Sequence, residues 1–450
     1  MNMMTLTVAA QAVGAKVRGG AEFMRVTTDS RTIQPGDLFV ALRGDKFDGH
    51  QFAQAALDAG AAAVLVDDRG AADLSPALVV ADTRLALGQL GAYWRKQMPA
   101  RIIGITGSSG KTSVKEMLAA ILRAEVGDEA VLATKGNFNN DIGMPLTLLR
   151  LQPQHQYGVI EMGMNHAGEI EYLTKLAEPD VALINNAGTA HIGMLGSVEA
   201  IAVAKGEILL GLPAEGVAVI NADDAFAPLW RQSAGKHAVL DFGVKQAATV
   251  KGRYVAQAEY SDVHISAPDM QLNLKLSALG EHSVMNALAA ATAAKALGIS
   301  GDAVVTGLQG FKGVYGRLQR KQGMNGCIVI DDSYNANPDS TRAAIDVLAA
   351  TSGTRYLVLG DMGELGTDEL KLHAEIGALA KNKGIDGLYA IGELSRHAVK
   401  AFGNGAQHFE TPEALKAELV STLKAGVTIL VKGSRFMQME RVVRILEEQA

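Results

Sequence analysis

The stretch that decides the fold is Ile102-Ile103-Gly104-Ile105-Thr106-Gly107-Ser108-Ser109-Gly110-Lys111-Thr112. It opens with a short apolar run, which predicts a buried strand, and passes through a turn rich in glycine and serine. The residues after the turn are apolar at helical spacing, at Val114, Met117, Leu118, Ile121 and Leu122. The stretch therefore predicts a strand, a turn and an amphipathic helix in succession.

The turn has the residue types that a phosphate-binding loop needs. Glycines let backbone N–H groups curl around an anion, the helix N-terminus adds partial positive charge, a lysine reaches terminal phosphates and a threonine hydroxyl can bind Mg²⁺. The first glycine of the longer form of this motif is replaced by Ile105. The alternative is a glycine-rich turn with a capping serine. We predict nucleotide binding by Gly107, Ser108, Ser109, Gly110, Lys111, Thr112 and Ser113.

Outward from this stretch, the pattern divides the chain into three segments, as its 450 residues lead one to expect. Residues 1–98 alternate short apolar runs with a helical stretch near Gln51–Ala59, which predicts a small α/β domain. Residues 99–316 predict a mostly parallel sheet. An antiparallel edge is predicted at residues 249–277, where apolar residues recur at about every second position. A helix is predicted at Ser283–Leu297. Residues 317–450 predict a Rossmann-like α/β domain. The expected strands of the last two segments are Gly158–Met162, Val181–Asn185, Val217–Asn221, Ile328–Asp331, Tyr356–Leu359, Leu388–Ile391 and Thr428–Val431.

Composition narrows the class of protein. With 48% hydrophobic and 20% charged residues the chain is globular, and its 49 glycines indicate many turns. One cysteine and no signal-peptide pattern at the start favour the cytoplasm. A net charge of −6 argues against nucleic-acid binding, and no uncharged apolar run approaches the roughly 20 residues of a membrane helix. We therefore expect neither a nucleic-acid partner nor membrane insertion.

Two further polar residues follow predicted strands of the same sheet. Glu161 ends the strand at Gly158–Met162, and His191 lies in a loop after Val181–Asn185. Alone, the glutamate could be a solvated surface residue and the histidine a structural partner. Ligands bind at the carboxyl ends of strands in open α/β sheets, so their shared position favours a metal or nucleotide site.

Together these residues resemble the Mur ligases, the ATP-dependent amide-forming enzymes of peptidoglycan precursor synthesis, over essentially the whole chain. The resemblance implies ATP and Mg²⁺, with Thr112, Glu161 and His191 as metal ligands. It also implies that Lys205, otherwise a solvated helix lysine, is carbamylated and binds metal as well. The implied catalytic residues are Lys111, Glu161, His191 and Lys205.

The same resemblance implies further contacts with ATP. Gly280–Ala287 is similar to a family segment that places Asn286 near the adenine, although Ser283 replaces the family's first asparagine. Arg317 matches a hinge arginine that reaches ATP, and Asp332 matches an aspartate on the ribose or phosphate side. Asp332 could also cap the helix expected after Pro338.

Other segments are similar to the family's substrate-binding regions. The opening domain resembles the UDP-binding domain of the third- and fourth-step ligases. The resemblance implies that Ser30 and Arg31 bind the uridine diphosphate side of the substrate, but they could be only a polar turn. Residues 134–140 resemble a substrate loop of the fourth-step ligase, and asparagine also favours turns. Residues 331–338, 359–366 and 432–435 resemble segments of the same ligase. The implied substrate residues are Ser30, Arg31, Asp48, Gly49, His50, Asn137, Asn139, Asn140, Asn335 and Asn337.

The resemblance implies a cytoplasmic, monomeric ligase that joins D-alanyl-D-alanine (D-Ala-D-Ala) to a UDP-N-acetylmuramoyl-tripeptide (UDP-MurNAc-tripeptide) through an acyl phosphate. C-terminal domain closure about residues 313–320 is expected to bring Arg317 and Asp332 onto ATP. Two alternatives remain open. The chain could add a single amino acid, as third-step ligases and folylpolyglutamate synthases do, or it could bind nucleotide without catalysis.

Overall fold

Strand β10 (Arg101–Thr106) is apolar on both faces. Ile103 and Ile105 pack into one core with helix α4 (Lys111–Val126), whereas Ile102 packs into a second core on the opposite face. Such a strand needs cover on both sides. The computed structural model, which describes residues 2–45, 47–70 and 73–447, places β10 in a central sheet with helices on both sides.

The central sheet has nine strands in the order β11-β12-β10-β13-β14-β15-β16-β17-β18. It is parallel from β11 to β16, and β17 and β18 add an antiparallel edge. The other strands are β11 (Val131–Ala133), β12 (Tyr157–Glu161), β13 (Val181–Ile184), β14 (Val217–Asn221), β15 (Ala238–Gly243), β16 (Val250–Ala256), β17 (Ser261–Ala267) and β18 (Met270–Leu276). The helices are α4, α5 (Gly143–Leu148), α6 (Glu169–Ala177), α7 (Ile192–Leu195), α8 (Val198–Gly206), α9 (Ala227–Ser233), α10 (Glu281–Ala296) and α11 (Gly301–Gly310).

The N-terminal body contains a five-stranded sheet in the order β2-β9-β8-β5-β4 and two short strand pairs, β1 with β3 and β6 with β7. Its strands are β1 (Met4–Thr5), β2 (Lys16–Arg18), β3 (Glu22–Phe23), β4 (Arg25–Thr27), β5 (Asp37–Val40), β6 (Arg43–Gly44), β7 (Phe47–Asp48), β8 (Ala63–Asp67) and β9 (Ala77–Val80). Its helices are α1 (Leu6–Val13), α2 (Ala53–Asp58) and α3 (Thr83–Gln97).

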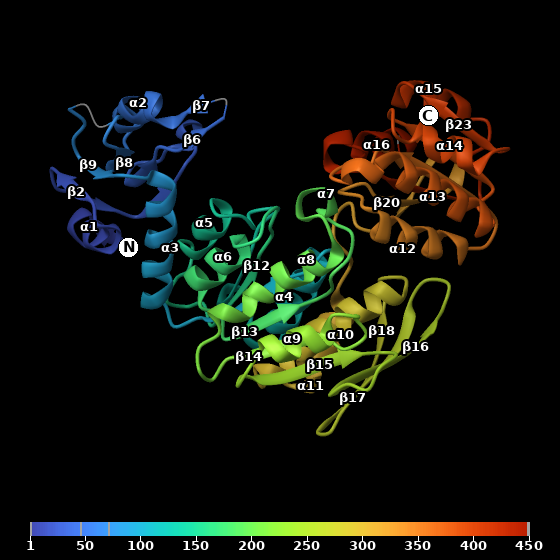
Figure 1. Ribbon diagram of the computed structural model, residues 1–450, viewed down its shortest axis with the longest axis horizontal. Coiled ribbons are helices and arrows are strands. Elements are labelled where there is room, and N and C mark those ends of the chain that lie inside the picture. Colours follow the sequence, from blue (N-terminus) through green and yellow to red (C-terminus); the bar gives the residue numbers. More distant parts are fainter. Residues whose placement is uncertain (1, 46, 71–72, 448–450) are drawn as a thin grey trace.

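Helix α3 joins this body to the central one (Figure 1). Trp94 Nε1 donates to the carbonyl of Leu151 (2.9 Å), and Arg95 Nε donates to the carbonyl of Ala177 (2.8 Å). Leu149 of the central body is buried within the N-terminal core. The two bodies therefore share both hydrogen bonds and apolar core.

The C-terminal body is a six-stranded sheet in the order β19-β20-β24-β21-β22-β23, parallel except for β19. Its strands are β19 (Gln319–Gln322), β20 (Ile328–Asp332), β21 (Thr354–Gly360), β22 (Gly387–Ile391), β23 (Ala406–Phe409) and β24 (Val427–Lys432), and its helices are α12 (Pro338–Ala349), α13 (Glu369–Asn382), α14 (Arg396–Phe402), α15 (Pro412–Leu419) and α16 (Glu440–Glu447). Asp332 at the end of β20 and Lys432 at the end of β24 line a pocket together with residues of the central body.

The predicted fold class is confirmed, and each large sheet lies inside one of the three predicted segments. The limits at 98/99 and 316/317 stay predictions. In the central and C-terminal segments, four of the described strands were not expected: β11, β15, β19 and β23. β19 has no apolar residue, so its hydrophobic pattern carries no strand signal. No helix within residues 2–45, 47–70 and 73–447 is long and apolar enough to cross a membrane.

Candidate functional site

The turn between β10 and α4 is held by side chains that follow β13. Asn186 Oδ1 accepts from Ser109 N–H (2.9 Å), and the amides of Asn185 and Asn186 donate to the Ser109 carbonyl at 2.9 and 3.1 Å. Gly110 has a φ of +79°, and a Cβ there would lie 2.4 Å from Asn286 Oδ1, so only glycine fits. Helix α4 begins after Gly110 without a side-chain cap, which removes the capping-serine alternative and leaves its N-terminal amides for a ligand.

Lys111 lies at the mouth of this loop. Its Nζ donates to the Gly107 carbonyl at 2.6 Å. Burial lowers the pKa of Lys111 from its ordinary value, while the charge of Glu161 opposes the shift. A partly desolvated cation beside free helix amides attracts an anion strongly.

Glu161 is the centre of a polar cluster at the end of β12. It is only 2% exposed, so the surface alternative is wrong. Thr112 Oγ1 donates to Glu161 Oε2 (3.0 Å), Asn139 Nδ2 donates to Oε1 (2.8 Å), and Arg317 Nη2 donates to Thr112 Oγ1 (3.1 Å). The structure thus brings together residues predicted for the metal, the substrate loop and the hinge.

Lys205, on α8, is buried at 1% exposure, so it is not a solvated helix lysine. The side chain of Lys205 makes no hydrogen bond or ion pair with any described residue. Burial, helped by the nearby charge of Lys111, lowers the pKa of Lys205 well below its ordinary value. The lowered pKa favours the neutral amine, which is the nucleophilic form of lysine.

His191 precedes α7 with a left-handed backbone (φ +66°). Its Nδ1 lies 2.7 Å from Oε2 of Glu364, in the C-terminal body, and His191 holds the pKa of that carboxyl below its usual value. The described parts of the chain contain no group of three or more His, Cys, Asp or Glu placed to hold a metal. Mg²⁺ typically takes one or two carboxylates and completes its shell with water and substrate phosphates, so the oxygens of Glu161 and Thr112 fit it.

The phosphate loop, with Lys111 and Thr112, lines a cleft of about 1390 Å³ between the central and C-terminal bodies, whereas Glu161, His191 and Lys205 are not among the residues that line it. Asn286, Arg317 and Asp332 line it as well. Arg317 stacks on the ring of Tyr334 at 4.5 Å, and its buried Nε has no hydrogen-bond partner in the described structure. An unpaired buried donor beside a phosphate-type loop suits a phosphorylated ligand.

The carboxylate of Asp332 already has partners within the protein. Lys432 Nζ lies 2.5 Å from Asp332 Oδ2, and Leu318 N–H donates to Oδ1 at 3.2 Å. Burial raises the pKa of Asp332, and the charge of Lys432 opposes this shift. The alternative role of Asp332 as a helix cap is wrong, because Asn337 caps α12 through a bond from Ser340 N–H (2.8 Å).

The predicted substrate asparagines take several positions. Asn337 Nδ2 also reaches Ser109 Oγ of the phosphate loop at 3.4 Å. Asn335 Oδ1 accepts from Ala336 N–H (2.9 Å), and Asn140 Oδ1 accepts from Gly143 N–H (2.8 Å) where α5 begins. Asn137 is exposed. Their substrate roles stay predictions.

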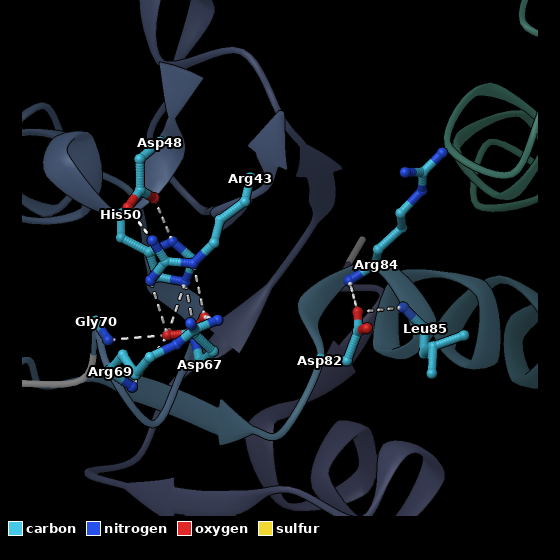
Figure 2. Close-up of polar contacts among 9 residues, drawn as sticks. All are labelled: Arg43, Asp48, His50, Asp67, Arg69, Gly70, Asp82, Arg84 and Leu85. Carbon is cyan, nitrogen blue, oxygen red and sulfur yellow. Dashed lines mark hydrogen bonds and ion pairs between the residues drawn. The ribbon is translucent and has the colours of Figure 1, made fainter. Parts of the chain in front are cut away.

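The N-terminal candidates lie in the first body, which contributes no described residue to the cleft, and Figure 2 shows Asp48 and His50 among them. His50 Nε2 accepts from Asp67 N–H (3.0 Å), so Nδ1 carries the proton that it donates to Asp48 Oδ1 (2.7 Å). Arg43 bridges Asp67 and Asp48. His50 is thus fully engaged by its own domain, and a substrate contact through its ring nitrogens would require these bonds to break.

The other three N-terminal candidates differ in environment. Arg31 is exposed and pairs with Asp29 at 2.8 Å, next to the first residue of its short helix, Ser30. Gly49 has no room for a side chain, since a Cβ would lie 2.8 Å from the backbone of Leu42.

Sequence reasoning missed several residues of the site. Asn185 ends an expected strand (Val181–Asn185) and Asn186 follows it directly, which is a usable signal. Lys432 lies in residues 432–435, a segment that is similar to the family, but the resemblance gave Lys432 itself no role. Lys115 is 1% exposed and donates to the Thr134 carbonyl at 2.6 Å, at the base of the 134–140 loop. Its helical pattern gives no sign of this contact.

Three family models match the chain: "Mur ligase family, catalytic domain" over residues 14–95, "Mur ligase middle domain" over 105–294 and "Mur ligase, glutamate ligase domain" over 316–435. The chain is 45% identical over 428 residues to the UDP-N-acetylmuramoyl-tripeptide–D-alanyl-D-alanine ligase of Escherichia coli (strain K12), covering 94% of this chain and 93% of that protein.

Solved structures agree. The MurF structure from Acinetobacter baumannii superposes with a TM-score of 0.92 at 37% identity and covers 99% of this chain and 98% of that one. The MurF ligase of Thermotoga maritima, in complex with ADP, superposes with a TM-score of 0.85 at 29% identity over 94% of this chain and 97% of that one. The chain belongs to the Mur ligase family.

Proposed function

We propose that this Mur ligase joins D-Ala-D-Ala to UDP-MurNAc-tripeptide with hydrolysis of ATP to ADP. The observation that carries the proposal is the 45% identity, over 94% of the chain, to a ligase of that name. The complex of the Thermotoga maritima relative with ADP supports ATP as the co-substrate. The cleft beside the phosphate loop is the place where we expect ATP to bind.

The reaction needs two displacements. The terminal carboxylate of the tripeptide attacks the γ-phosphorus of ATP and ADP leaves, which gives an acyl phosphate. The amine of D-Ala-D-Ala then attacks the acyl carbon, phosphate leaves, and the nitrogen loses a proton. In the first step Lys111, the amides at the start of α4 and Arg317 would neutralise the charge that gathers on the transferred group.

Mg²⁺ fits the donors around Glu161, with Thr112, His191 and a modified Lys205 as further ligands. When bound, it would supply charge stabilisation at the phosphates. Burial favours the neutral amine of Lys205, which can attack CO₂ to give a carbamate and one proton. The modification converts the lysine into an anionic oxygen donor of the kind that Mg²⁺ prefers.

The other predicted residues would bind the two acceptor substrates and the nucleotide. We propose that the N-terminal body and the 134–140 loop hold the UDP-MurNAc-tripeptide. Asn286 would approach the adenine and Asp332 the ribose or phosphate side of ATP. The ends of β20, β21 and β24 would hold the dipeptide, since ligands collect where strand order reverses. We further propose that the enzyme acts as a cytoplasmic monomer.

Release of ADP tests the function directly. With UDP-MurNAc-tripeptide and ATP present, we expect ADP release to depend on D-Ala-D-Ala, with D-alanine and other single amino acids as the matched comparison. A single amino acid that supports faster release than the dipeptide would favour the single-residue ligase. ATP binding without phosphoryl transfer in any mixture would instead favour a non-catalytic nucleotide-binding protein.

A further inference from the structure

Two residues with left-handed backbones meet where the C-terminal body contacts the central body. His191 has a φ of +66° and Glu364 a φ of +63°, and neither is a glycine. Their side chains meet, with Oε2 of Glu364 2.7 Å from Nδ1 of His191. Such backbones cost free energy in non-glycine residues and persist where the surroundings fix them, most often at functional sites.

The loop that carries Glu364 is fixed on three sides. Met362 N–H donates to Nε2 of the buried His373 (2.9 Å), and Gly363 N–H donates to Ser434 Oγ (2.8 Å). The third bond comes from the central body, where Gly193 N–H donates to the Glu364 carbonyl at 3.1 Å. The backbone that carries the Glu364 carboxylate is therefore fixed when the two bodies are docked.

Close backbone contact brings the two loops together. A Cβ on Gly366 would lie 3.0 Å from Gly193 Cα, and one on Gly193 would lie 2.6 Å from Gly366 N. In Figure 1 the short helix α7, which contains Gly193, extends from the central body to the C-terminal body. Contact between Glu364 and His191 thus requires that the two bodies be docked.

We propose that Glu364 is a positioning residue that orients His191 when the C-terminal body closes. With Oε2 only 2.7 Å from Nδ1, the carboxylate favours the neutral ring with its proton on Nδ1, which leaves Nε2 as the nitrogen with a free lone pair, the form in which imidazole binds a metal. The C-terminal body then selects the tautomer of His191, the histidine that the family resemblance assigns to Mg²⁺. This inference rests on the proposed function.

The test uses three variants of the full-length enzyme. Glu364→Gly removes the carboxylate and suits a left-handed backbone, so the thermal midpoint should not fall. Glu364→Gln keeps an oxygen that can accept the proton. Glu393→Gln is the matched control, because Glu393 is an exposed glutamate of the same body, paired with Arg396 at 3.1 Å.

Two readouts are needed. In metal-free protein saturated with ADP, ¹⁵N spectra of the histidine rings should show His191 protonated at Nδ1, with the signal assigned by its loss in His191→Asn. In Glu364→Gly the proton should move to Nε2, which the free neutral ring prefers. We expect kcat to fall about 10- to 100-fold in Glu364→Gly and less in Glu364→Gln, with an unchanged KM for D-Ala-D-Ala and a higher Mg²⁺ requirement.

An unchanged tautomer in Glu364→Gly would overturn the proposal. So would a loss confined to the KM for D-Ala-D-Ala, which would mean that the carboxylate binds the dipeptide's ammonium group. The ring spectra do not depend on turnover, so failure of the proposed function would appear separately, as a wild-type enzyme without dipeptide-dependent ADP release.

Discussion

Replacing Gly193 by alanine tests whether docking of the C-terminal body is part of the catalytic cycle. The added methyl group would lie 2.6 Å from Gly366 N and 2.9 Å from the Glu364 carbonyl oxygen, below the 3.0 Å that real Cβ contacts respect. Both neighbours are backbone atoms, which cannot rotate away. The local backbone of Gly193 is helical, so alanine adds no strain of its own.

The size of the effect follows from the overlap. Ordinary contact begins at 3.4 Å, so the two loops must separate by about 0.8 Å. Overpacking of this kind costs about 1–3 kcal/mol. If this penalty falls on closure of an enzyme that is mostly open, the closed population drops about 5- to 150-fold. The value of kcat should fall by the same factor, while the KM for ATP changes little because the phosphate loop is untouched.

Steady-state ADP release with saturating D-Ala-D-Ala measures this loss. Gly310→Ala is the control, because Gly310 also lies in a helix and its Cβ would meet nothing within 4 Å. Wild-type turnover in Gly193→Ala would refute the reasoning, as would an equal loss in Gly310→Ala.

Three further outcomes are expected. Lys111→Ala should lower D-Ala-D-Ala-dependent ADP release at least ~10³-fold, measured by single-turnover kinetics, because it removes the main cation of the phosphate loop. Lys205→Ala should abolish turnover and remove a ¹³CO₂-derived carbamate signal, and added formate should restore part of the rate. Burial lowers the pKa of His282 from 6.5 to about 4. Between these values the unfolded chain binds a proton that the folded chain does not, so the free energy of unfolding decreases as pH falls from 6.5 towards 4. Urea unfolding of His282→Asn should therefore show up to about 3 kcal/mol less pH dependence in that window than wild type.

The parts of the site that could be predicted are those whose chemistry is local in sequence. Residues 106–112 carry glycines, a lysine and a threonine in one turn, so strand, loop and helix follow from a few neighbours. Glu161 was found because it ends an apolar strand. The alternation of Ile102, Ile103 and Ile105 between two cores likewise follows from the period of a strand.

The parts that could not be predicted depend on contacts between distant segments. Glu364 belongs to the site only because Gly193 and Gly366 allow two loops to touch. The sequence cannot tell whether a histidine such as His50 faces a ligand or its own backbone, and here both ring nitrogens are occupied by the N-terminal domain. The burial of Lys205 depends on how α8 packs, which its low amphipathicity conceals.

The connection that helix α3 makes between the first two bodies affects how the protein unfolds on heating. The side chains of Trp94 and Leu149 lie in apolar cores shared by the first two bodies, whereas the buried residues of the two C-terminal cores all lie beyond residue 323. Heat should therefore unfold the first two bodies as one cooperative unit and the third as another. A calorimetric trace would contain two transitions. A nucleotide bound in the cleft between the two units would bring the two transition temperatures closer together.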